Sequence, residues 1–156
     1  GEVIINMFGG VGMFSLLAAK DTPCTVYNID LNPVASQLCK ENVQINKLKG
    51  EVISLNGDAT KVINEQLIGK ADRVLMLLPE RSDEFLDSAL NGLRDKGIIH
   101  YYSHMHADKK QDAAKLSEEH FLSVNKTNAK IITSRNVRPV GPRFYQTVVD
   151  VKISKN

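Results

Sequence analysis

The sequence predicts a doubly wound α/β fold, in which a mostly parallel sheet has helices on both faces and ends in an antiparallel hairpin. Three observations predict it. Short apolar runs alternate with helical patterns along the chain, and a glycine-rich turn follows the first run. The last two runs are separated only by residues 138–143, Arg-Pro-Val-Gly-Pro-Arg, a link too short for a crossover helix.

Seven strands are expected, because seven short runs are rich in apolar and β-forming residues. They lie at residues 3–7, 25–29, 52–55, 74–78, 98–102, 131–137 and 144–153. The short link makes the last two strands antiparallel neighbours, while the intervening helices make the earlier strands parallel.

Helices are expected between the strands, from the glycine turn to about residue 20 and at residues 33–45, 60–67, 82–93 and 109–120. Asn32 can cap the second helix, with Pro33 in its first turn, where a missing N–H has little effect. Ser82 can cap the fourth helix. No repeat or linker interrupts this order, so residues 1–156 should form a single domain.

The composition is that of an ordinary globular domain, with 156 residues, 42% hydrophobic and 24% charged. It excludes a disordered chain and a disulfide scaffold. Because no stretch of about 20 apolar residues and no signal peptide is present, we expect a cytoplasmic protein with no membrane partner. Cys24 and Cys39 are expected to pack as small apolar groups rather than to form a disulfide or bind a metal.

Basic residues are concentrated near the C-terminus. Residues 126–156 hold seven Lys or Arg side chains and one acidic residue, a net charge of +6, which leaves −4 for the first 125 residues. The asymmetry is typical of a surface that faces a polyanion such as nucleic acid. A set of solvated lysines and arginines gives the same pattern.

A nucleotide-like site is expected where the first three strands end, because ligands of doubly wound sheets bind at the carboxyl ends of the strands. Asp30 ends the second strand, twenty residues after Gly10, where a carboxylate can accept hydrogen bonds from ribose. Asp58 follows the third strand and can face an adenine amino group. The loop after the first strand comprises Phe8, Gly9, Gly10, Val11 and Gly12. The alternative is a tight turn followed by a helix-entry aspartate.

The glycine loop departs from the dinucleotide fingerprint. In G-x-G-x-x-G the third glycine would fall at Ser15. S-adenosylmethionine contains adenosine but no pyrophosphate, so it does not need the complete fingerprint. We therefore favour this cofactor over NAD.

Five segments, in order, carry a family resemblance. They are NMFGGVGMFSLLAAK (6–20), NIDLNPVASQLCKENVQINKL (28–48), ADRVLMLLPERSDEFLDSAL (71–90), GIIHYY (97–102) and VRPVGPRFYQTVVDVKI (137–153). They resemble the archaeal and eukaryotic tRNA (guanine(37)-N(1))-methyltransferase family and its relatives in wybutosine synthesis. The resemblance implies a Rossmann-like class I methyltransferase fold. It also implies that S-adenosylmethionine lies across Phe8, Gly9, Gly10, Val11, Gly12, Asp30, Leu31, Asn32, Asp58, Ala59 and Leu78.

The implied reaction is methyl transfer to N1 of guanosine 37 in the anticodon loop of tRNA. The alternatives are aminocarboxypropyl transfer in wybutosine synthesis and a non-catalytic domain that binds cofactor and RNA. We expect a monomer without a metal. Because the chain starts without Met, two residues before a strand, we also expect a fragment that lacks N-terminal RNA-binding or catalytic segments.

The segment after the fourth strand carries the implied catalytic residues. Leu78 and Pro79 would lie beside the transferable methyl and the target base. The family usually has N-L-P here, and Leu77 replaces the Asn, so the hydrogen bonds of an amide must come from another group. Glu80 is our candidate for a local base or acceptor, and the alternative is a solvated charge at a helix start. The family's own base and guanine-binding arginine lie upstream of the first glycine motif, outside this chain.

Four arginines are candidates for contacts with RNA phosphates, namely Arg81, Arg135, Arg138 and Arg143. Each could instead be an ordinary surface arginine.

Three histidines, His100, His104 and His106, suggest a metal site, but their spacing is undiagnostic and structural roles are favoured. Tyr101 and Tyr102 are expected to be strand residues first and base-stacking groups second.

Overall fold

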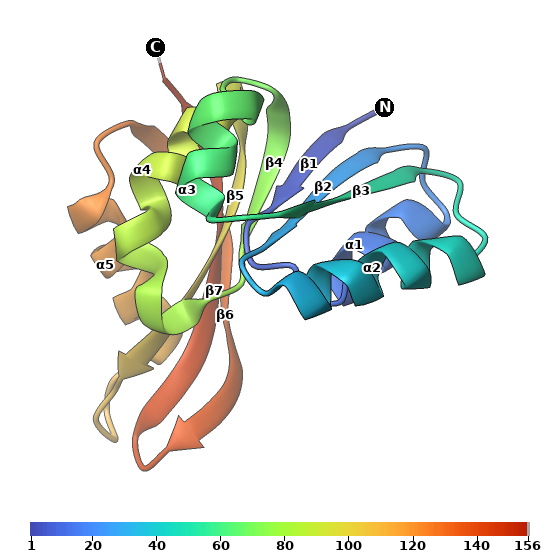
Figure 1. Ribbon diagram of the computed structural model, residues 1–156. Helices are drawn as coiled ribbons and strands as arrows, with labels where there is room; N and C mark the ends of the chain where they lie inside the picture. Colours follow the sequence, from blue (N-terminus) through green and yellow to red (C-terminus); the bar gives the residue numbers. More distant parts are fainter. Residues whose placement is uncertain (156) are drawn as a thin grey trace.

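The computed structural model describes residues 1–155 and contains one seven-stranded sheet in the order β3-β2-β1-β4-β5-β7-β6 (Figure 1). The strands are β1 (Val3–Asn6), β2 (Thr25–Asp30), β3 (Glu51–Asn56), β4 (Ala71–Met76), β5 (Leu93–His106), β6 (Asn128–Gly141) and β7 (Phe144–Ser154). β1 to β5 are parallel, and β7 runs antiparallel between β5 and β6. The predicted fold class is confirmed.

The helices form a layer on each side of the sheet. α1 (Met13–Lys20) and α2 (Pro33–Ile45) cover β1 to β3 on one face, and α3 (Ala59–Val62), α4 (Ser82–Gly92) and α5 (Ala113–Val124) cover the other (Figure 1). A π-helical turn, η1 (Ile63–Leu67), continues α3, and a 3-10 turn, η2 (Pro79–Arg81), leads into α4. None of the helices among residues 1–155 is long and apolar enough to cross a membrane.

Two apolar clusters hold these layers together. The larger lies between the sheet and α3, α4 and α5, and includes the fully buried Ile5, Met76, Ile99 and Phe121. The smaller lies under α1 and α2 and contains Ile4, Ala19, Cys24, Val26, Cys39 and Val52. Both cysteines are buried free thiols whose pKa values are raised by burial, so the expected packing role is confirmed.

Of the two predicted helix caps, one is confirmed and one is wrong. Asn32 caps α2, since its side chain accepts a 2.9 Å hydrogen bond from the amide of Val34. The prediction that Ser82 caps α4 is wrong. Its hydroxyl donates to the carbonyls of Leu78, at 3.1 Å, and Tyr102, because η2 runs into α4 without an extended residue between them.

Several element boundaries also differ from the predictions. α5 begins four residues later than expected, after Asp112, which caps it. The expected helix at 60–67 changes from α to π after Val62. β5 and β6 are each 14 residues long, because their ladders with β7 pair polar as well as apolar residues. The end of β5 with the β6–β7 hairpin therefore forms an arm that projects beyond the helices (Figure 1).

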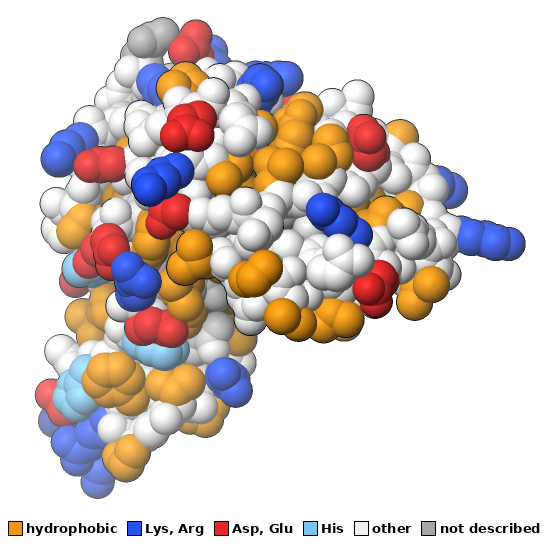
Figure 2. Space-filling model, in the orientation of Figure 1, with side chains coloured by type: hydrophobic (Ala, Val, Ile, Leu, Met, Phe, Trp, Pro, Cys, Tyr) orange, Lys and Arg blue, Asp and Glu red, His pale blue; other side chains and the backbone are white. Residues whose placement is uncertain are grey.

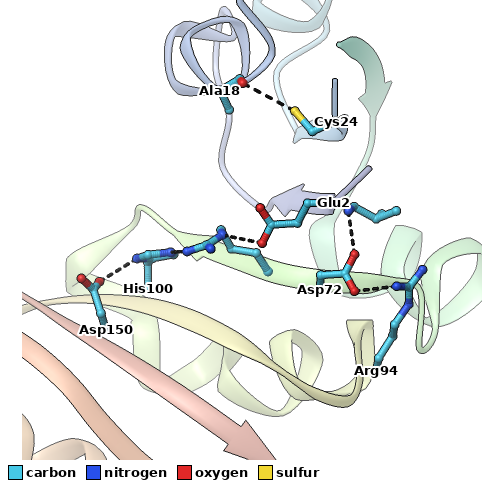
Figure 3. Close-up of polar contacts among 9 residues, drawn as sticks. Glu2, Ala18, Cys24, Asp72, Arg94, His100 and Asp150 are labelled. Atoms are coloured by element: carbon cyan, nitrogen blue, oxygen red, sulfur yellow. Dashed lines mark hydrogen bonds and ion pairs between the residues drawn. The ribbon is translucent and has the colours of Figure 1, made fainter. Parts of the chain in front are cut away.

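A row of polar contacts crosses the sheet (Figure 3). Glu2 accepts a 2.9 Å hydrogen bond from Arg73, and both ring nitrogens of His100 are engaged, one by Arg73 and one by Asp150, each at 2.6 Å. Burial is the main cause that lowers the pKa of His100. His100 therefore has a structural role within the sheet, as the sequence favoured.

Candidate active site

The glycine loop after β1 packs closely on its neighbours. A Cβ atom at Gly9 would lie 2.0 Å from Oδ1 of Asn28, and one at Gly12 would lie 2.7 Å from Sγ of Cys39. Gly10 has a positive φ of 54°, and a Cβ there would meet nothing within 4 Å. Gly9 and Gly12 therefore serve the packing of the loop, and Gly10 faces open space.

A buried polar network supports this loop. The side-chain nitrogen Nδ2 of Asn6 donates a 3.1 Å hydrogen bond to the hydroxyl of Ser15. The Ser15 hydroxyl in turn donates one of 2.7 Å to Oδ1 of Asn28. Asn28 in turn donates to the carbonyl of Gly10 at 3.2 Å. Ser15, which replaces the third glycine of the fingerprint, thus connects the side chain of Asn6 on β1 to that of Asn28 on β2. Oδ1 of Asn6 is buried and has no partner among residues 1–155.

Asp30 joins the loop to the start of α2. Its Oδ2 accepts a 2.8 Å hydrogen bond from the amide of Gly10, and its Oδ1 accepts one of 2.8 Å from Asn32. The carbonyl of Asp30 accepts from the amide of Gly57 at 3.0 Å. The ends of β1, β2 and β3 are therefore tied together around this residue.

The first of two pockets lies over these strand ends and is named here the Asp30 pocket. It has a volume of about 460 Å³, within the range of small-molecule sites. Six predicted cofactor residues line it: Phe8, Asp30, Leu31, Asp58, Ala59 and Leu78. Gly9, Gly10, Val11, Gly12 and Asn32 do not line it and lie in the adjacent loop and helix start.

Sequence reasoning did not assign five residues of this lining to the cofactor: Met7, Gly57, Leu77, Arg81 and Phe85. Of these, Leu77 was placed in the catalytic segment and Arg81 among the RNA contacts. Phe85 packs edge-on against Phe8, with ring centres 4.8 Å apart. Its position on the apolar side of α4 makes it look like a core residue, so the sequence carries no signal for its place in the pocket.

The second pocket, named here the Asp83 pocket, has a volume of about 550 Å³. It is lined by Pro79, Glu80, Arg81, Ser82, Asp83, Glu84, Tyr101, Ser103, His104, Met105, His120 and Phe144. Figure 2 shows acidic and histidine side chains beside hydrophobic ones below α4, near the arm. The two pockets adjoin at Arg81, which lines both. Leu78 lines the Asp30 pocket and Pro79 the Asp83 pocket, so the predicted catalytic segment stands between them.

Two of the charged residues between the pockets pair with each other. Arg81 donates from Nε and Nη2 to the carboxylate of Glu84, at 2.8 and 2.5 Å, and its guanidinium lies 5.1 Å from the centre of the Phe85 ring. These hydrogen bonds lower the pKa of Glu84. Glu80 is exposed and makes no hydrogen bond or ion pair with any of residues 1–155.

Asp83 is held by two neighbours. The hydroxyl of Tyr101 donates to Oδ1 of Asp83, and Nε2 of His120 lies 2.7 Å from Oδ2. Tyr101 is 1% exposed, and burial and the Asp83 carboxylate both raise the pKa of its hydroxyl, so the phenol stays protonated. Because Tyr101 is buried, its alternative role as a base-stacking group is wrong.

Three of the four candidate RNA-binding arginines lie on the arm. Arg138 donates to the side chain of Gln146 at 3.0 Å, and Arg143, at the turn, donates to Asp108 at 3.2 Å. Arg135 is exposed on β6. Arg81 is separate from them, between the pockets.

The strand order, the loop after β1 and the carboxylate at the end of β2 define a class I methyltransferase-type α/β domain. Comparison with known proteins agrees with this class. Residues 1–132 match the TRM5/TYW2 methyltransferase domain, and the chain belongs to that family. The resemblance found in the sequence is confirmed.

Two curated relatives and one solved structure illustrate the family. The chain is 40% identical to the tRNA 4-demethylwyosine(37)-methyltransferase Taw21 of Saccharolobus solfataricus, over 97% of the chain and 54% of the relative. It is 36% identical to the tRNA (guanine(37)-N(1))-methyltransferase Trm5b of Methanocaldococcus jannaschii, over 99% and 41%. The crystal structure of M. jannaschii TYW2 in complex with AdoMet superposes with a TM-score of 0.82 at 31% identity, over 100% and 70%. The chain spans about half the length of the curated relatives it matches.

Proposed function

We propose that this domain transfers the methyl group of S-adenosylmethionine to N1 of guanosine 37 in the anticodon loop of tRNA. The observation that carries the proposal is the pair of adjoining pockets, with Leu78 lining one and Pro79 the other. Methyl transfer requires donor and acceptor side by side in near-attack geometry. Both curated relatives described above are named as methyltransferases of position 37 in tRNA.

The residues of the Asp30 pocket fit the cofactor. Phe8, Leu31 and Leu78 offer apolar surface for a nucleoside, and Asp30 and Asp58 offer carboxylates for hydroxyl and amino donors. The unpartnered Oδ1 of Asn6 lies below the same loop but is buried and does not line the pocket, so a water molecule rather than the cofactor itself would satisfy it. S-adenosylmethionine would supply an electrophilic methyl group.

The chain's own residues then bind the target guanosine and accept the proton that its N1 loses. Guanine N1 carries a hydrogen that must leave as the methyl group arrives. Glu80 lines the Asp83 pocket and is unpaired, which supports a role as acceptor of that proton. Arg135, Arg138 and Arg143 on the arm would bind phosphates of the anticodon arm.

Titration calorimetry and mass analysis test this function. S-adenosylmethionine and S-adenosylhomocysteine should bind and NADH should not, and tRNA incubated with the protein and S-adenosylmethionine should gain one methyl group at guanosine 37. Failure of both sulfur cofactors to bind would contradict the cofactor assignment. Gain of an aminocarboxypropyl group would contradict methyl transfer.

A second acceptor is favoured by one specific observation. Leu77, in place of the family's Asn, lines the Asp30 pocket and cannot hydrogen-bond to a base. This change supports a modified, wybutosine-type guanosine 37 as the substrate, for methyl or aminocarboxypropyl transfer. The same mass analysis, with unmodified tRNA compared with tRNA carrying 4-demethylwyosine, distinguishes the two acceptors.

A further inference from the structure

The Asp83 pocket is acidic, although the proposed substrate is a polyanion. Three carboxylates, those of Glu80, Asp83 and Glu84, line it, and only Arg81 among the Lys and Arg residues does so. The Arg81 guanidinium is already paired with Glu84. Because the pocket keeps uncompensated negative charge, it repels a phosphate and favours a neutral group that presents hydrogen-bond donors.

Its other walls suit a flat aromatic ligand. His104 and Phe144 line the pocket with ring centres 6.4 Å apart, and Phe144 is 40% exposed although it is large and apolar. Pro79 also lines this pocket, next in the chain to Leu78, which lines the Asp30 pocket. The pocket thus combines aromatic rings with carboxylates, the kinds of group that bind a nucleobase.

Asp83 is held more firmly than Glu80. The neutral Tyr101 hydroxyl can only donate to it, and His120 holds its second oxygen at 2.7 Å. Each carboxylate oxygen keeps a further lone pair for a ligand, since an ionised carboxyl group has about four acceptor sites. Asp83 is therefore an oriented acceptor, whereas Glu80 makes no hydrogen bond within residues 1–155.

Glu84 is paired with Arg81, and the other two carboxylates of the pocket, those of Asp83 and Glu80, together match only one of the standard RNA bases. Guanine places two donors side by side, N1–H and the exocyclic N2 amino group. Adenine and cytosine place a ring acceptor beside their amino group, and uracil flanks its N–H with two carbonyls. A second carboxylate would face an acceptor in each of those three bases.

We propose that Asp83, held by Tyr101 and His120, is a specificity-determining residue that accepts a hydrogen bond from the exocyclic amino group of the target guanine. Glu80 then faces N1–H. This assignment rests on the proposed transfer to guanosine 37. His120 is a positioning residue that acts through Asp83.

Inosine provides the test, because it differs from guanosine only by lacking the N2 amino group. Anticodon stem–loop RNAs with guanosine or inosine at position 37 are titrated against the protein in the presence of S-adenosylhomocysteine, with fluorescence anisotropy as the readout. The wild-type protein should bind the guanosine RNA about tenfold more tightly, the value of one hydrogen bond to a charged group. Asp83→Ala should reduce this ratio to near one, mainly by weakening the guanosine complex.

Asp87→Ala is the matched control, because Asp87 is exposed on the same helix and does not line the pocket. It should keep the wild-type ratio, and His120→Ala should give an intermediate one. Since a ratio of two affinities cancels a general loss of folded protein, a merely structural effect of Asp83→Ala would leave it unchanged.

The outcomes separate this inference from the proposed function. An unchanged ratio in Asp83→Ala, with methyl transfer to guanosine 37 intact in the wild-type protein, overturns the role of Asp83 alone. Absence of transfer to any tRNA together with equal affinity for both RNAs overturns the proposed function, and the role of Asp83 with it.

Discussion

The two pockets are built in different ways. The Asp30 pocket is formed largely by residues that directly follow β1, β2, β3 and β4, and its loop is held by main-chain hydrogen bonds and glycines. The Asp83 pocket is formed by side chains from η2, α4, β5, α5 and β7, which are far apart in the sequence. The Asp30 pocket therefore follows from the fold, whereas the Asp83 pocket depends on the particular side chains that these five elements carry.

The largest effect is expected where the glycine loop packs against β2. Gly9→Ala would place a methyl group against Asn28, whose side chain is buried and hydrogen-bonded to Ser15 and cannot move freely. Overpacking and the loss of a buried hydrogen bond should together lower the free energy of unfolding by about 3 kcal/mol. Denaturant unfolding measures this change.

Gly10→Ala is the control for that substitution. A Cβ atom at Gly10 meets nothing within 4 Å, so only its left-handed conformation should matter, at about 1 kcal/mol. Equal losses in the two variants would show that the loop is not constrained by its packing on Asn28.

Asp30→Ala should affect the cofactor more than the fold. Removal of the carboxylate frees the amides of Gly10 and Asn32 and takes away a charged acceptor from the pocket. We expect the dissociation constant for S-adenosylmethionine to rise at least about tenfold, measured by calorimetry. Asp21→Ala, an exposed carboxylate after α1, should bind as the wild-type protein does. Unchanged affinity in Asp30→Ala would argue against the ribose assignment.

Replacement of the arm cations should have a smaller, salt-dependent effect. Arg138→Ala with Arg143→Ala should weaken tRNA binding about three- to tenfold at low salt and reduce the slope of log affinity against log salt by about 1.5. A double Lys40→Ala and Lys47→Ala variant removes two exposed charges near α2, far from the arm along the sheet. If both double variants lose affinity equally, the contribution of the arm is only that of general surface charge.

The smallest effect is expected at His100, a β5 residue in the row of polar contacts that crosses the sheet. Its folded pKa is lowered, mainly by burial, so the unfolded chain binds the proton more readily. The stability contributed by neutral His100 is present above the unfolded pKa of about 6.5 and is lost as the pH falls from there toward the lower folded value. His100→Gln should therefore have a shallower fall in unfolding free energy between about pH 7 and pH 5 than the wild-type protein. Parallel curves would contradict this.

The strand order and the Asp30 pocket could largely be predicted, because both follow from local signals. Alternation of apolar runs with helices determines a parallel sheet, and the carboxyl ends of adjacent parallel strands meet at one edge. Asp30 and Asp58 were therefore predictable at that edge. The short link before Phe144 predicted the antiparallel hairpin for the same kind of reason.

The sequence by itself thus determined the fold class, the family and the location of the Asp30 pocket. Only the tertiary structure decided that Ser15 links two strands below the glycine loop, that Ser82 bonds to carbonyls instead of capping α4, and that Tyr101 and His120 meet at Asp83. Periodicity and capping rules describe a residue's neighbours along one element. Contacts between residues such as Asp83 and His120, 37 positions apart, depend on how α4, β5 and α5 pack together, and no local pattern encodes that packing.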